Sequence, residues 1–184
     1  MRCFGDGDPL YERYHDDEWG VPVTDEPGLF ERLVLESFQS GLAWITILRK
    51  REAFRAAFAA FDIAAVARFD EGDVERLLGD AGIVRNRAKI EAAIGNARAT
   101  MALHDTGGTL RELLWEGGEP AGLATRMKAL GFRFLGPVTI ESALQACGVV
   151  NGHPESCPAW ARVDALQRPG DGSPRRRPAG PTRW

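Results

Sequence analysis

The chain has 184 residues, of which 44% are hydrophobic and 27% charged, and its formal net charge is −3. These values fit one folded domain and exclude a mainly disordered protein, a collagen-like protein and a disulfide-rich scaffold. No apolar run reaches the ~18 residues that a membrane span needs, and the first residues show no signal peptide. The three cysteines are too scattered for a disulfide framework, so we expect a reducing, cytoplasmic protein.

Charge is distributed unevenly along the chain. Residues 158–184 carry six arginines against two aspartates, which leaves the body of the protein acidic. An acidic body argues against tight, unspecific coating of nucleic acid, but it allows a small basic patch that holds a few phosphates. The end of the chain is rich in proline, glycine and arginine and cannot build a core. We therefore predict one domain over residues 1–160 and a disordered tail over residues 161–184.

Apolar residues recur at helical spacing along most of the chain, and alternating strand patterns are nearly absent. Thr24 or Asp25 can cap the first clear helix, which has Glu26 and Pro27 in its first turn and ends before Gly41. Further helices are expected at Trp44–Phe58, Ile63–Phe69, Val74–Leu78, Arg87–Met101, Leu110–Trp115, Thr125–Leu130 and Thr139–Cys147. The pattern predicts an all-α bundle with one shared core.

Two pairs of potential metal ligands lie at opposite ends of the sequence. Cys3 and His15 are near the N-terminus, and His153 and Cys157 are near the C-terminus. Two thiolates and two imidazoles suit tetrahedral zinc, and four protein ligands leave no open position for water. A lone cysteine is nevertheless more often a small core residue, and the first spacing matches no common zinc finger. Spacing alone leaves both interpretations open. Cys147 lies in an apolar helix pattern and is expected in the core.

Large aromatic rings are concentrated in the first 44 residues, which contain both tyrosines of the chain. Tyr11 and Tyr14 are three residues apart, so they share a face if this segment is helical. Trp19 and Trp44 follow. Rings with polar tips can enclose a flat base and hydrogen-bond its edge. Ordinary aromatic packing produces the same pattern, and the sequence does not separate the two.

Glu36 stands among the apolar residues Leu33, Val34 and Phe38 of a predicted helix. A buried carboxylate is unfavourable unless it is paired or used. Burial would raise its pKa, and a nearby cation would lower it. A carboxylate that faces a cationic ligand enclosed by rings is a consistent arrangement. The helical spacing equally allows Glu36 to point to solvent.

A glycine turn separates two predicted helices between residues 77 and 90. Gly82 permits a tight turn with close approach of the backbone, and the N–H groups that begin the next helix can bind a phosphate. Arg85, Arg87 and Lys89 add positive charge beside them. A helix-hairpin-helix holds one DNA strand in this way without reading its sequence.

These segments together resemble the 3-methyladenine DNA glycosylase I family, over nearly the whole chain from Cys3 to about Cys157. One departure is that family members usually carry a tryptophan two residues after the first cysteine, where this chain reads Cys3-Phe4-Gly5. The matching stretches are Asp8–Tyr11, Tyr14–Pro22, Leu35–Thr46, Ala81–Ile90, Gly95–Arg98, Gly131–Pro137, Gln145–Gly148 and Val150–His153.

The resemblance implies an all-helical fold of the helix-hairpin-helix DNA glycosylase type. One structural zinc ion per chain would join the N- and C-terminal regions, with Cys3, His15, His153 and Cys157 as its ligands. The implied partner is double-stranded DNA with alkylated bases. We expect a monomeric, monofunctional enzyme that flips the damaged base and hydrolyses its N-glycosidic bond.

The resemblance also assigns roles around the base. Glu36, Tyr14 and Trp44 map onto the base pocket, with Tyr11 and Trp19 close by. Leu42, after Gly41, maps onto the segment that enters the gap left in the duplex by the flipped nucleotide.

Two other functions remain to be weighed. The first is a non-catalytic helix-hairpin-helix protein that binds DNA, against which the intact set of Glu36, Tyr14 and Trp44 argues. The second is a zinc hydrolase with the ion as Lewis acid. It needs an open coordination position, which two cysteines and two histidines would close.

Overall fold

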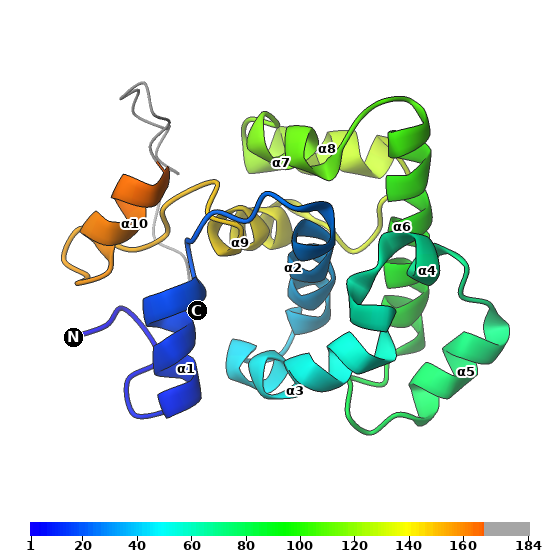
Figure 1. Cartoon of the computed structure of the whole chain (residues 1–184), viewed down its shortest axis with the longest axis horizontal. Coiled ribbons are helices and arrows are strands. Elements are labelled where there is room, and N and C mark those ends of the chain that lie inside the picture. Colours follow the sequence, from blue (N-terminus) through cyan, green and yellow to red (C-terminus); the bar gives the residue numbers. More distant parts are fainter. Residues whose placement is uncertain (168–184) are drawn as a thin grey trace.

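The computed structural model describes residues 1–167, and every regular element in that range is a helix (Figure 1). The all-α prediction is confirmed. The part of the tail prediction that concerns residues 168–184 lies outside the described residues. The elements in chain order are α1 (Pro9–Arg13), the π-helix η1 (Tyr14–Glu18), α2 (Glu26–Gln39), α3 (Trp44–Ala57), η2 (Ala59–Phe61), α4 (Ile63–Ala67), α5 (Glu71–Gly79), α6 (Arg87–Asp105), α7 (Leu110–Trp115), α8 (Pro120–Ala129), α9 (Pro137–Ala146) and α10 (Trp160–Gln167).

The helix α10 corrects the domain boundary expected at residue 160. Val163 and Gln167 in α10 are buried, and Gln167 Nε2 donates a hydrogen bond of 2.8 Å to the carbonyl of Gly20. The spacing of Trp160 and Val163 is helical, but the proline- and arginine-rich composition of the following residues masked this short element. The folded domain therefore extends at least to Gln167.

Three helices begin before their predicted starts. α5 begins at Glu71 rather than Val74, with a capping box formed by Asp70 and Asp73. α8 begins at Pro120 rather than Thr125, and α9 begins at Pro137 rather than Thr139. Proline suits the first turn because the N–H that it lacks would have no partner inside the helix. The starts of α8 and α9 were therefore marked in the sequence by proline, not by the apolar pattern.

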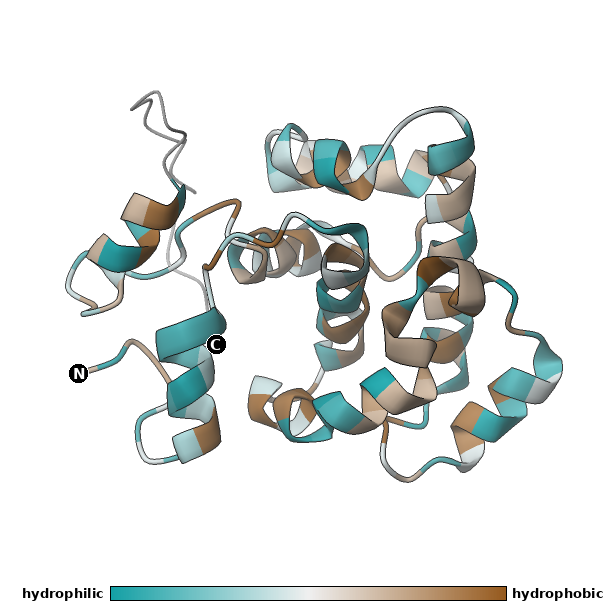
Figure 2. Cartoon of the chain, in the orientation of Figure 1, coloured by the Kyte–Doolittle hydropathy of each residue, from teal (hydrophilic) through white to brown (hydrophobic). Residues whose placement is uncertain are grey.

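α2 lies at the centre of the molecule and contacts α3, α6, α7 and α9 (Figure 1). Its residues from Leu33 to Phe38 are all buried. One continuous cluster of buried apolar residues runs from Tyr14 to Val149, as expected for a single shared core. Most helices carry both polar and apolar residues around their circumference (Figure 2), which fits one buried and one exposed face.

The first residues and η1 lie beside the segment that leads into α10, so segments from the two ends of the domain meet (Figure 1). Among the described helices, none is both long and apolar enough to cross a bilayer.

Candidate active site and metal centre

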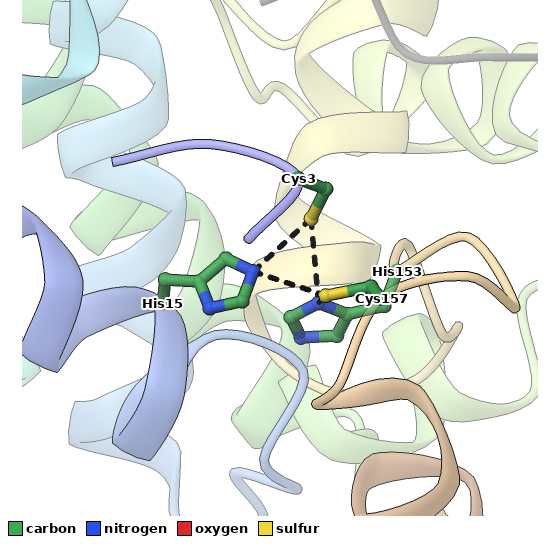
Figure 3. Close-up of side chains that lie close together, drawn as sticks. All are labelled: Cys3, His15, His153 and Cys157. Atoms are coloured by element: carbon green, nitrogen blue, oxygen red, sulfur yellow. Dashed lines mark hydrogen bonds between the residues drawn. The ribbon is translucent and has the colours of Figure 1, made fainter. Parts of the chain in front are cut away.

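Four potential metal ligands from the two ends of the domain converge (Figure 3), with their ligand atoms within 4.8 Å of one another. Sγ of Cys3 lies 3.1 Å from Nε2 of His15 and 3.5 Å from Nδ1 of His153. Sγ of Cys157 lies 3.3 Å and 3.4 Å from the same two nitrogens. Zinc bonds of about 2.3 Å to sulfur and about 2.1 Å to nitrogen place the two atom types roughly 3.5 Å apart in a tetrahedron. The four residues therefore fit a tetrahedral zinc ion.

Each histidine is oriented through its other ring nitrogen. Nδ1 of His15 lies 2.8 Å from Oδ1 of Asp16, and Nε2 of His153 lies 3.2 Å from the carbonyl oxygen of Trp19. These contacts turn Nε2 of His15 and Nδ1 of His153 towards the two thiols. Acceptors of this kind commonly fix the tautomer of histidines that bind metal.

The charge of the cluster also favours a cation. Burial, together with the neighbouring Cys157 thiol, raises the pKa of Cys3 to about 12, so two thiolates here need a compensating positive charge. Burial lowers the pKa of His153 to about 4, which keeps its imidazole neutral, as a metal ligand must be.

The π-helix η1 connects this cluster to a second group of side chains. Tyr14 and His15 are adjacent in η1, and both are buried. The ring of Tyr14 lies 5.3 Å from that of Trp44, centroid to centroid, at an angle of 42°. Phe4 lies between the two groups, 4.8 Å from the ring of His15 and 6.4 Å from that of Tyr14. Phe4 thus joins the aromatic cluster although it departs from the family pattern.

Glu36 is only 3% exposed, so the solvent-facing alternative is wrong. Within the described residues, its Oε2 has no hydrogen-bond partner, and the same is true of the indole Nε1 of Trp44. Burial raises the pKa of Glu36 to about 8, although the guanidinium of Arg32 opposes the shift. The pKa values of Tyr11 and Tyr14 are raised mainly by the burial of these two tyrosines, and the negative charge of Glu36 raises them further. A buried acceptor and a buried donor that both lack partners are typical of a site that receives a polar ligand.

The rings of Tyr14 and Trp44 pack against each other. Tyr14 and Trp44 contact each other at a tilt, which leaves no room for a flat base between their planes. Trp19 is 1% exposed and packs edge-on against His153, at 4.4 Å between centroids. It therefore lies against the metal cluster, and its contact with a base stays a prediction.

The segment predicted to hold phosphates joins α5 to α6. A Cβ atom on Gly82 would lie 2.8 Å from Cβ of Ala53, so the packing here favours glycine, and the contact of this turn with a phosphate stays a prediction. Arg85 is exposed. Arg87 is exposed but paired with three glutamates. Lys89 is a correction: it is 8% exposed, and its ammonium donates to two backbone carbonyls, so it does not face a DNA backbone.

Leu42 lies in the turn between α2 and α3 and is 38% exposed. Ser40 has φ −48° and ψ 115°, Gly41 has φ +84°, and the N–H of Leu42 donates to the carbonyl of Gln39 at 2.6 Å. These values describe a type II turn, which favours glycine at its third position. The turn presents Leu42 at the surface, which is necessary for a side chain predicted to enter a gap in the DNA duplex.

A second helical hairpin was missed from the sequence. α8 packs against α9, and residues 130–136 connect them. The N-cap of α9 is Gly136 and offers no side-chain hydrogen bond, so the first N–H groups of α9 are available to an anion. The buried amide of Asn96 bonds both the N–H and the carbonyl of Arg133, and Phe134 next to it is exposed with φ +56°. The proline at the first position of α9 was the available signal.

Comparisons with known proteins point to one family. The family model for methyladenine glycosylase matches residues 4–121 and 117–160. DNA-3-methyladenine glycosylase 1 of Escherichia coli (strain K12) is 44% identical in an alignment of 170 residues, with 82% of this chain and 91% of that protein covered. A crystal structure of 3-methyladenine DNA glycosylase I matches with a TM-score of 0.82 and 42% identity, over 86% of this chain and 98% of that one.

A third match is the Staphylococcus aureus 3-methyladenine DNA glycosylase I, whose structure is described as the basis of 3-methyladenine recognition. Its TM-score is 0.81 and its identity 36%, over 85% of this chain and 94% of that one. With a family model that spans most of the sequence and relatives above one third identity, this chain belongs to the 3-methyladenine DNA glycosylase I family.

Proposed function

We propose that this protein is a DNA glycosylase that hydrolyses the N-glycosidic bond of 3-methyladenine in double-stranded DNA. The observation that carries the proposal is that two buried polar atoms have no partner in the described part of the chain, Oε2 of Glu36 and Nε1 of Trp44. Both residues relate to Tyr14, Glu36 through its charge and Trp44 through its ring. A buried carboxylate oxygen without a partner is costly to stability and is typical of a functional site. The relatives named for 3-methyladenine support the choice of substrate.

The substrate explains why one carboxylate is enough. Alkylation at N3 makes the adenine formally cationic, so it leaves without protonation by a general acid. Entry of this cation lowers the pKa of Glu36 again and favours its carboxylate form, which accepts hydrogen bonds from the edge of the flipped base. Tyr14 and Trp44 border the base, with Tyr11 nearby. Water attacks the sugar carbon as the base leaves.

The DNA is held by groups at the surface. Leu42, at the tip of its turn, enters the duplex as an apolar wedge and replaces the flipped nucleotide. Arg85 beside the Gly82 turn supplies positive charge for phosphates. The open N-terminus of α9 with Arg133 adds a second phosphate contact, because its N–H groups have no side-chain cap. Arg87 contributes less, since it is already paired.

The metal is a structural zinc ion, one per chain, held by Cys3, His15, His153 and Cys157. When bound, it ties the first residues to the segment before α10 and neutralises the two thiolates. All four positions are filled by protein atoms, so the ion does not activate water. This is the reason to prefer the glycosylase over the zinc hydrolase.

The enzyme acts as a cytoplasmic monomer without a strand-cleaving lyase step. Such a step needs a lysine that forms a Schiff base with the sugar. Two of the three lysines in the sequence have occupied ammonium groups, Lys89 through two carbonyls and Lys50 through the carbonyls of Ala81 and Gly82. The third, Lys128, is exposed in the last turn of α8, whereas Glu36 is buried.

Release of 3-methyladenine from methylated duplex DNA tests the function directly. We expect turnover by the parent protein and a loss of about 100-fold or more in Glu36→Gln, in the range seen when a positioned catalytic group is removed. Glu52→Gln is the matched control, since Glu52 is exposed and, among residues 1–167, pairs only with Arg55. Absence of base release by the parent, with DNA binding intact, would instead identify the non-catalytic DNA-binding protein.

A further inference from the structure

The positive charge of Lys89 lies at a position where it destabilises its own helix, α6. It is the third residue of α6, close to the positive end of the helix dipole, and it is almost fully buried. Burial lowers the pKa of its ammonium. A lysine in such a position needs a partner that offsets both effects.

The partner is the C-terminus of α2. Nζ of Lys89 donates to the carbonyl of Phe38 at 2.9 Å and to the carbonyl of Ser40 at 2.7 Å. α2 has no basic residue in its own last turn, so Lys89 supplies the positive charge that satisfies its terminal carbonyls.

The contact with Ser40 has a specific consequence for the turn that follows. The carbonyl of Ser40 belongs to the central peptide of the turn Gln39–Leu42. Type I and type II turns differ mainly in the orientation of that peptide, which rotates by about 180° between them. By holding this oxygen, Lys89 fixes the type II form, in which Gly41 has φ +84°.

We propose that Lys89 is a positioning residue for the wedge: it locks the Ser40–Gly41 peptide and thereby holds Leu42 in the orientation that enters the duplex. This inference rests on the proposed function, because it gives the turn a role in base flipping. Lys89 touches neither the base nor the sugar and acts through Leu42. Lys89 also links the segment that follows the Gly82 turn to the turn that carries Leu42. The phosphate-binding segment and the inserted side chain therefore keep a fixed position relative to each other.

The test is a double-mutant cycle between Lys89→Met and Leu42→Ala, measured as the single-turnover rate of base release from methylated duplex DNA. We expect Lys89→Met to lower the rate by about tenfold or more, equivalent to about 1.4 kcal/mol. In the Leu42→Ala background it should lower the rate by less than about twofold, because the wedge is already absent. Lys89→Arg, which keeps a donor cation, should restore most of the rate.

Arg98→Met is the matched control. Arg98 lies on the same helix and also donates to two backbone carbonyls, those of Ala67 and Phe69. It should leave the excision rate unchanged. Should Lys89→Met fail to fold, Gly41→Ala replaces it in the cycle, because a Cβ there meets no atom within 4 Å but strains the positive φ.

Two readouts separate positioning from a general structural role. Affinity for free 3-methyladenine, followed by tryptophan fluorescence, should be the same in Lys89→Met and the parent, since the pocket is intact. The backbone chemical shifts of Ser40 and Gly41 should move in Lys89→Met but not in Arg98→Met. Additive losses in the cycle, an equal loss of free-base affinity, or unmoved shifts would overturn the proposal. An inactive parent would refute the proposed function, while the shifts would still decide whether Lys89 sets the turn.

Discussion

Asp16 orients the metal ligand that precedes it: its Oδ1 lies 2.8 Å from Nδ1 of His15, while Nε2 of His15 faces the two thiols. Asp16 is in turn held by the guanidinium of Arg2, whose Nε and Nη2 both donate to its carboxylate. The residue before the first cysteine thus holds the carboxylate that orients His15.

We predict that Asp16→Asn lowers zinc affinity by about 10- to 100-fold, the range found when such supporting groups are removed. Competition with a chromophoric chelator would measure it. Asp17→Asn is the control, since Asp17 is exposed on the same π-helix. Equal affinities of the two variants would show that the carboxylate does not act on the ligand.

The zinc site itself is tested by metal analysis and chelation. We predict about one zinc ion per purified chain, lost in Cys157→Ala and retained in Cys147→Ala, whose thiol is buried in the core away from the cluster. Chelation should lower the thermal midpoint by roughly 10 °C or more, since about 1 kcal/mol moves it by roughly 2–4 °C in a domain of this size. A metal-free protein with an unchanged midpoint would contradict the assignment.

Glu36 should make stability depend on pH in a defined direction. Its pKa is about 8 when folded against an ordinary value of 4.5. Because the folded state binds the proton more tightly, this stabilisation is fully present below about pH 4.5 and is lost as the pH rises to about 8. Glu36→Gln should therefore gain stability over the parent across this window, by about 1.4 kcal/mol for each pKa unit that the buried site imposes.

Urea unfolding of both proteins below, within and above that window measures the difference. Glu52→Gln should follow the parent at every pH, because that side chain is 80% exposed. A constant difference between Glu36→Gln and the parent would mean that Glu36 titrates normally in the folded state.

The three surface arginines should differ in their effect on DNA binding. In the described part of the chain, neither Arg85 nor Arg133 forms an ion pair, whereas Arg87 is paired with Glu71 and Glu75. Neutralising Arg85 or Arg133 with glutamine should weaken binding and reduce the salt slope by about 1. Arg87→Gln should change the slope less, and the reverse order would mean that DNA displaces the glutamates. Fluorescence anisotropy over a range of salt concentrations measures these slopes.

Helical periodicity and caps were sufficient to predict the all-α class and most helices, because both act within one or two turns of chain. Prediction from local pattern missed α10, because its short helical pattern precedes a segment rich in proline and arginine. It also placed the starts of α8 and α9 too late, because a proline and not an apolar residue marks each start. The burial of Cys147 was also predictable, since it follows directly on the apolar pattern of α9 as the C-cap of that helix.

Which polar residues face inward was decided by tertiary structure. The apolar spacing around Glu36 allowed either a buried or an exposed carboxylate, and only the packing of neighbouring helices around α2 buries it. Lys89 looked like a phosphate ligand beside Arg85 and Arg87, yet the C-terminus of α2, about fifty residues away in sequence, captures its ammonium. Cys3 and His153 are 150 residues apart. The residue types indicate which side chains can bind a metal or a base. Only the folded chain sets the distances between these side chains and removes them from water, and their chemistry depends on both.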